Sequence, residues 1–77
     1  MLKLTKNDGS FIICEANDNP KSVLMGTLMY YTDRQHRLLT FEDAAKIPGM
    51  IRPNTYAYYY GSFNKAAELA WSRITSE

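Results

Sequence analysis

The sequence predicts an α+β fold, a β-hairpin followed by four helices, in a single domain over residues 1–77. Three observations predict it. Two short apolar runs flank an Asn-Asp-Gly turn, helix-start signals recur along the rest of the chain, and a Gly-Ser corner precedes the last helix. With 77 residues, 45% of them hydrophobic and 13% aromatic, the chain can form one compact core without disulfides or metal.

We place the hairpin over residues 2–15. The turn residues Asn7-Asp8-Gly9 favour the positive φ angles of a tight connection between the strands LKLT and FIICE. An isolated two-stranded hairpin is marginally stable in water, so we expect it to lie against the helices. The lone cysteine, Cys14, lies in the apolar second strand, and we expect it to be a buried small hydrophobe.

The helical part is predicted over residues 20–75, and its first helix runs from Pro20 to about His36. Asn19 is suited to cap the first turn, and Pro20 is tolerated at the first helical position. Apolar residues then recur at steps of three and four, as on a buried helix face. Gly26 interrupts this pattern, and we expect it to mark a close approach of two helices.

Three shorter helices are expected after that. Thr40-Phe41-Glu42-Asp43 resembles a capping box and begins a helix that ends at Ile47, because Pro48 stops the hydrogen-bond ladder and Gly49 permits a left-handed turn. The next helix covers residues 53–60 and carries the tyrosines. Gly61 ends it, and Ser62 caps the last helix, residues 63–75, whose inward stripe consists of Phe63, Ala66, Ala67, Ala70, Trp71 and Ile74.

The formal charge of +1 gives no overall signature of a nucleic-acid binder, but the second half of the chain is mildly basic. Residues 46–77 contain two acidic residues and the cations Lys46, Arg52, Lys65 and Arg73. No stretch has the length of a membrane span, and the N-terminus lacks the apolar core of a signal peptide. We therefore expect a cytoplasmic protein with no membrane partner.

We expect no enzyme, no cofactor and no metal site. The adjacent carboxylates Glu42 and Asp43 point in different directions on a helix, and their place in its first turn is explained by capping and the helix dipole. The serines lack a matched base, and the chain has no phosphate-binding loop. The single histidine, His36, has no second His or Cys at ligand spacing.

The order of a short helix, a Gly-containing turn and a second short helix is that of a helix-turn-helix, whose second helix presents its first turn to the DNA major groove. Here the turn is residues 48–52. Arg suits guanine, Asn suits adenine, and Tyr hydroxyls reach phosphates. The candidate DNA-contacting residues are Arg52, Asn54, Thr55, Tyr58 and Tyr59, with Lys46, Lys65 and Arg73 as candidates for neutralising neighbouring phosphates.

The same residues also admit a purely structural interpretation. Asn54 or Thr55 would then be the N-cap of the helix, Tyr58 and Tyr59 would cover the core, and Arg52 would be solvated. A helical hairpin is a common arrangement, and its turn chemistry specifies no partner.

Residues 40–71 resemble the homing-endonuclease-associated repeat, a small helical module. The resemblance is carried by Thr40, Pro53, Thr55, Tyr56, the corner Tyr60-Gly61-Ser62-Phe63-Asn64, Ala66 and Ala70. The chain departs from the family pattern where Leu39 replaces Pro, Tyr60 replaces Phe, Phe63 replaces Trp and Trp71 replaces Gly, and the hairpin lies outside the match. The resemblance implies DNA binding beside nucleases or in mobile elements.

We therefore expect a small accessory or regulatory protein that binds double-stranded DNA, from a prophage or another mobile element. An alternative is a protein-interaction module whose exposed contact patch consists of the tyrosine cluster, Met50 and Ile51, because Tyr and Met are enriched at such surfaces. A further alternative is a homodimeric structural protein whose hairpin pairs edge to edge with a copy of itself.

Overall fold

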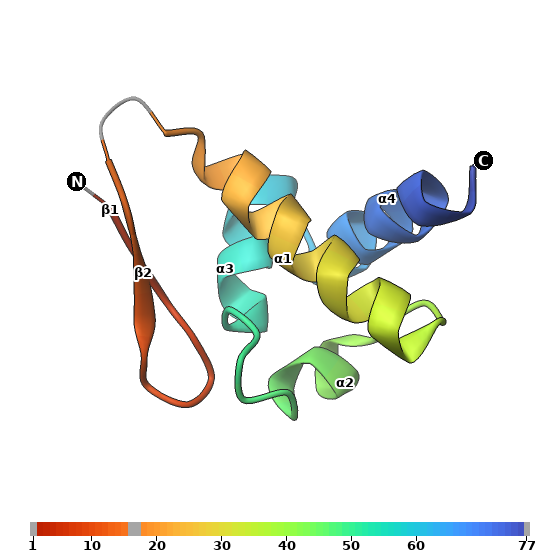
Figure 1. Cartoon of the computed structure of the whole chain (residues 1–77), viewed down its shortest axis with the longest axis horizontal. Helices are drawn as coiled ribbons and strands as arrows, with labels where there is room; N and C mark the ends of the chain where they lie inside the picture. The colour runs from red at the N-terminus through yellow and green to blue at the C-terminus, as the bar shows by residue number, and fades with distance from the viewer. Residues whose placement is uncertain (1, 16–17, 77) are drawn as a thin grey trace.

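A computed structural model of the chain describes residues 2–15 and 18–76. Strands β1 (Leu2–Thr5) and β2 (Phe11–Cys14) precede the four helices α1 (Pro20–Gln35), α2 (Phe41–Ala45), α3 (Pro53–Tyr60) and α4 (Phe63–Thr75). The hairpin flanks the helices on one side, and the C-terminus lies on the opposite side (Figure 1). The predicted α+β architecture of a hairpin and four helices is confirmed.

The hairpin has one buried and one exposed face. β1 and β2 are antiparallel, with Leu4 opposite Ile12 and Lys3 opposite Ile13. Gly9 takes φ +92°, the left-handed residue that a three-residue hairpin loop requires, and its N–H donates to the Lys6 carbonyl at 3.1 Å. Leu4 and Cys14 face the core, which confirms that the cysteine is buried.

Main-chain hydrogen bonds join the hairpin to the segment between α2 and α3. The Thr5 carbonyl accepts from the Arg52 N–H at 3.1 Å, and the Asn7 N–H donates to the Met50 carbonyl at 2.9 Å. The Asn7 side-chain amide also donates to the carbonyls of Ala44 and Ile47, both at 2.7 Å, at the C-terminal end of α2. The hairpin therefore lies against the helices, as expected.

α1 begins and ends with local caps. Asn19 Oδ1 accepts from the Lys21 N–H at 3.0 Å, and the left-handed His36, at φ 54°, donates its N–H to the Thr32 carbonyl at 2.7 Å. The interpretation of Gly26 as a close helix approach is wrong. This residue is exposed, and a Cβ built on it meets no atom within 4 Å.

The connection from α2 to α3 corrects two expectations. Thr40 and Asp43 form the predicted capping box, but α2 ends at Ala45, before Ile47. Gly49 does not take a left-handed φ. A side chain there would instead clash with the Tyr31 hydroxyl, so packing explains the glycine. The connection covers residues 46–52, longer than the roughly three or four residues of a helix-turn-helix turn.

α4 packs against α1 and α3 with a stripe of small residues. Ala66, Ala67 and Ala70 are fully buried, so the three helices approach closely around the Tyr56 ring. Trp71 and Ile74, which were predicted on the same stripe, are only half-buried, and Trp71 packs edge-on against the exposed His36 with centroids 6.3 Å apart. At the start of α4, Gly61 takes φ +92° and Ser62 Oγ accepts from the Lys65 N–H at 3.2 Å.

Candidate nucleic-acid interface

α3 has two faces of opposite character. Pro53 and Tyr56 are buried on one face, and Asn54 and Tyr58 are exposed on the other. The Tyr58 side chain is 82% exposed, the highest value among the exposed large hydrophobic residues that the structure describes. The helix therefore carries both a core anchor and a solvent-facing surface within eight residues.

Tyr56 fixes α3 to the rest of the helical core. Its ring is 0% exposed and packs edge-on against Phe63, with centroids 5.7 Å apart. Its hydroxyl donates to the Leu24 carbonyl of α1 at 2.9 Å. Burial raises the pKa of the Tyr56 phenol far above its ordinary value, so the hydroxyl stays protonated and remains a donor. The orientation of α3 is thus set from its buried side.

The hairpin also holds the first turn of α3 in place. Arg52 is the N-cap residue, and its N–H donates to the Thr5 carbonyl at 3.1 Å. No side chain caps this helix, so the interpretation of Asn54 or Thr55 as the N-cap is wrong. Pro53 explains the difference, because it occupies the first helical position and moves the cap one residue earlier.

The four clustered tyrosines have four different environments. Tyr58 and Tyr59 form an edge-to-face pair with centroids 5.1 Å apart, and Tyr59 packs partly against the core. The Tyr60 hydroxyl donates to the Lys21 carbonyl at 3.0 Å, and burial raises the pKa of its phenol. Of the two tyrosines interpreted as core cover, Tyr59 fits that interpretation in part and Tyr58 does not. The expectation that Met50 and Ile51 belong to an exposed patch with the tyrosines is wrong, because both side chains are fully buried in the core.

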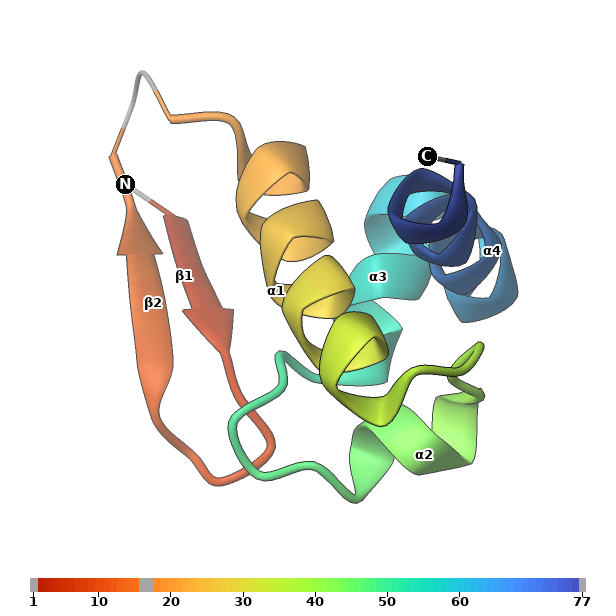
Figure 2. The same ribbon diagram turned by 45° about the vertical axis from the view of Figure 1, so that its right-hand side comes forward.

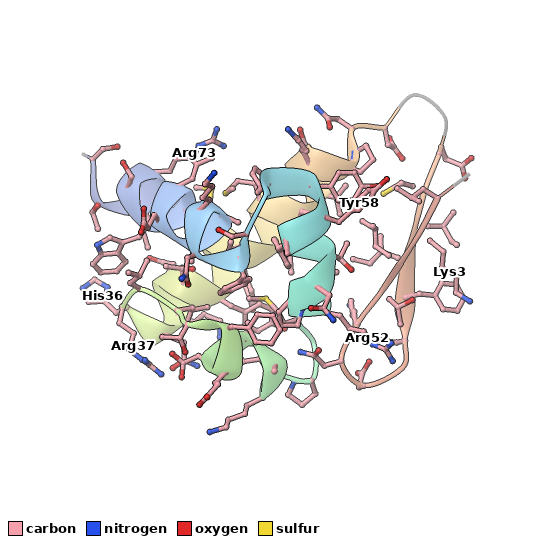
Figure 3. All side chains as sticks on the ribbon, turned by 180° about the vertical axis from the view of Figure 1, so that it is seen from behind. Lys3, His36, Arg37, Arg52, Tyr58 and Arg73 are labelled. Atoms are coloured by element: carbon pink, nitrogen blue, oxygen red, sulfur yellow. The ribbon has the colours of Figure 1, made fainter. Side chains whose placement is uncertain are left out.

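The structure gathers five of the eight candidate DNA-contacting residues and separates the other three. The gathered residues lie on α3 and its N-cap: Arg52, Asn54, Thr55, Tyr58 and Tyr59. Lys46 follows α2 and lines a surface hollow with Arg37 and Asp43. Lys65 lies in the first turn of α4, and Arg73 lines a second hollow with Lys21 and Tyr60. Figure 3 shows Arg52 and Tyr58 in the half of the molecule near the hairpin and Arg73 in the opposite half.

Sequence reasoning passed over two lysines that lie in the same parts of the molecule as candidate residues. Lys21 shares the hollow of Arg73, with its Nζ 5.3 Å from the centroid of the Tyr60 ring. Lys3 lies on the hairpin, in the same half of the molecule as Arg52 (Figure 3). No local motif could have indicated either lysine, because both positions depend on how the hairpin and α1 pack.

The described residues contain no group of three His, Cys, Asp or Glu side chains that could hold a metal ion. Within the same residues, no helix is long and apolar enough to cross a membrane. The chain matches no family model, no curated protein and no solved structure. The resemblance to the homing-endonuclease-associated repeat therefore stays an interpretation of the residues that carry it.

Proposed function

We propose that this protein binds double-stranded DNA through the exposed face of α3, as a small accessory or regulatory protein. One observation carries the proposal. The exposed side chains Arg52, Asn54 and Tyr58 lie at the start and middle of a helix whose opposite face is buried and hydrogen-bonded to α1. Because its buried face already fixes the orientation of this helix, its first turn can be presented to a major groove.

The chemistry of these side chains suits a duplex. A guanidinium bonds the two major-groove acceptors of guanine, and an amide pairs with the acceptor and donor of adenine, which fits Arg52 and Asn54. The Tyr58 hydroxyl can donate to a phosphate oxygen. α3 has no acidic residue in its first turn, so no carboxylate repels the phosphates there.

The charge distribution limits the strength of this binding. Arg52 is the only cation among the five gathered residues, and the formal charge of the whole chain is +1. Each phosphate that a lysine or arginine neutralises contributes about −0.9 to the slope of log K against log salt, so a single gathered cation limits the expected slope to roughly −1. This shallow dependence would distinguish contacts centred on α3 from a broad electrostatic surface.

Fluorescence anisotropy with a labelled duplex at low and moderate salt tests the proposal. Replacing Arg52→Ala should weaken binding by roughly 5- to 150-fold, the range for loss of a bidentate base contact. Arg34→Ala is the matched control, because it removes the same charge from an exposed position on α1. Absence of binding at low salt, or equal losses in the two variants, would contradict the proposal.

A second candidate is a protein-interaction surface centred on Tyr58. Two observations favour it: this residue is 82% exposed, and the chain has a formal charge of only +1. Exposed tyrosines often anchor contacts between proteins. Replacing Tyr58→Phe separates the two candidates. Loss of the hydroxyl should weaken a phosphate contact but should largely preserve an apolar anchor.

A further inference from the structure

Two surface hollows each carry two cations, but only one of them has a carboxylate to balance the charge. The hollow beside the end of α1 is lined by Arg37, Asp43 and Lys46, and the Arg37 guanidinium pairs with the Asp43 carboxylate at 2.9 Å. The hollow beside the start of α1 is lined by Lys21 and Arg73, with no acidic residue among the described residues that line it. The second hollow therefore keeps two positive charges without a counter-charge in its lining.

This second hollow, which we name the α1–α4 hollow, has a volume of about 220 Å³. The N-terminal end of α1 and the C-terminal end of α4 lie at the same end of the molecule, with the hairpin on the other side of α1 (Figure 2). The residues that line the hollow are Asn19, Lys21, Ser22, Met25, Tyr60, Leu69 and Arg73. The lining combines two cations, polar side chains and apolar surface.

Tyr60 brings the two cations to one place. Its hydroxyl donates to the Lys21 carbonyl at 3.0 Å, and the Lys21 Nζ lies 5.3 Å from the centroid of its ring. Burial raises the pKa of the Tyr60 phenol, and the charge of Arg73 opposes this rise. Lys21 of α1 and Arg73 of α4 therefore approach the same tyrosine, and an anion between them would relieve the repulsion of the two like charges.

Side chains, rather than the free end of the helix, supply the remaining donors of the hollow. The Lys21 N–H already donates to Asn19 Oδ1 at 3.0 Å. The N–H groups of Ser22 and Val23 donate to the Asn19 carbonyl at 3.0 and 3.3 Å. Asn19 Nδ2 and the Ser22 hydroxyl are the polar donors that accompany the two cations. A lining rich in donors suits a ligand with several acceptor oxygens.

We propose that the α1–α4 hollow binds a phosphate group. A phosphate monoester carries a charge of about −1.5 to −2 at pH 7 and three strong acceptor oxygens, which match two cations and two neutral donors. A guanidinium such as that of Arg73 bonds two phosphate oxygens at once, and an ammonium such as that of Lys21 binds as a point charge. Met25 and Leu69 offer apolar surface to the group that the phosphate is attached to.

This site goes beyond the DNA-binding surface proposed on α3. Arg73 and Arg52 lie in opposite halves of the molecule (Figure 3), so the hollow is separate from the first turn of α3. Two sources carry the same chemistry, a small phosphate ester and the backbone of a duplex. The experiment therefore needs one arm without DNA and one arm with it.

Titration with inorganic phosphate at constant ionic strength and without DNA, followed by amide chemical shifts, tests the site. We expect saturable shifts at Lys21, Ser22 and Arg73, with half-saturation on the order of millimolar phosphate. Lys21→Gln and Arg73→Gln should each weaken binding by roughly tenfold, because each removes a charge-assisted hydrogen bond. Lys46→Gln is the matched control, since it removes an exposed cation of the other hollow and should leave phosphate binding unchanged.

Shifts that grow linearly without saturation, or equal losses in Lys21→Gln and Lys46→Gln, would overturn the proposal. A duplex without terminal phosphates then identifies the source of the group. It should leave the amides of Lys21 and Arg73 unshifted if the ligand is a small phosphate ester. It should shift them, and bind Arg73→Gln more weakly, if the ligand is the DNA backbone. Because the phosphate titration contains no DNA, its outcome does not depend on DNA binding by α3.

Discussion

The exposed face of α3 and the outer face of the hairpin are both open to solvent, but different interactions hold them in place. α3 is held by a buried side chain, Tyr56, which packs on Phe63 and hydrogen-bonds to α1. The hairpin is held by the inward side chains Leu4, Ile12 and Cys14 and by hydrogen bonds to the segment before α3. The first surface is polar and aromatic, and the second is largely apolar.

This difference assigns different roles to the two surfaces. A rigid helix with Arg, Asn and Tyr side chains suits recognition by hydrogen bonds, which need fixed geometry. An edge with free main-chain groups suits strand pairing, which depends little on side-chain identity. Four substitutions or conditions can break or sharpen the comparison.

Tyr56→Ala should produce the largest effect. Removing a fully buried aromatic ring should lower the free energy of unfolding by about 3–5 kcal/mol. Chemical denaturation monitored by circular dichroism measures the change. The matched control is Tyr58→Ala, which removes the same ring from the exposed side of α3 and should change stability by less than about 0.5 kcal/mol. Similar losses in the two variants would mean that α3 does not have one anchored and one free face.

Asn7→Ala should have a smaller effect, at the junction of the two regions. The substitution leaves the carbonyls of Ala44 and Ile47 without their side-chain donor and should lower the free energy of unfolding by about 1–3 kcal/mol. Hydrogen exchange should accelerate at the Asn7 and Arg52 amides before it accelerates in α4. Asn54→Ala, the same change at an exposed position, serves as control. Equal hydrogen exchange in the two variants would contradict the claim that the Asn7 side chain joins the hairpin to the end of α2.

Gly26→Ala should stabilise the protein by roughly 0.5–1 kcal/mol, because alanine is the better helix former and its methyl group meets open space. Thermal unfolding measures the gain. Gly49→Ala is the counterpart and should be destabilising, since its methyl group would displace the Tyr31 hydroxyl. A loss of stability in Gly26→Ala would show that this position packs against another part of the chain.

Acidification should give the smallest effect, confined to the start of α2. The Arg37 guanidinium, with the Thr40 N–H, lowers the pKa of the Asp43 carboxyl from 3.8 to about 2. The ionised form is favoured by folding, so this stabilisation is complete above pH 3.8 and is lost as pH falls through about 2. Asp43→Asn should flatten the stability profile in that window. An unchanged profile would mean that the carboxylate has no folded-state partner.

Local signals predicted the elements well, because caps and turns are encoded within a few residues. Asn19, Thr40 and Ser62 each cap the helix that they were expected to cap. The errors concern residues whose role depends on distant contacts. A Cβ at Gly49 would meet the Tyr31 hydroxyl, whereas a Cβ at Gly26 would meet no atom within 4 Å. The spacing of apolar residues reveals neither of these environments.

The candidate site, too, could be predicted only where a local pattern determines it. The exposed face of α3 follows from its apolar pattern, since Tyr56 and Tyr58 lie on different sides of a helix. The positions of Lys46, Lys65 and Arg73 relative to that face depend on how the helices pack, which local periodicity does not determine. The role of Asn7 at the end of α2 likewise depends on a contact between residues about forty positions apart in sequence.

Amide chemical shifts, recorded at one protein concentration with and without a DNA duplex, test the central claim most directly. The account predicts that the duplex shifts the amides of residues 52–59 most strongly and leaves those of residues 11–13 unchanged. Duplex-induced shifts centred on the hairpin, or none at low salt, would contradict the assignment of α3 as the DNA-binding surface.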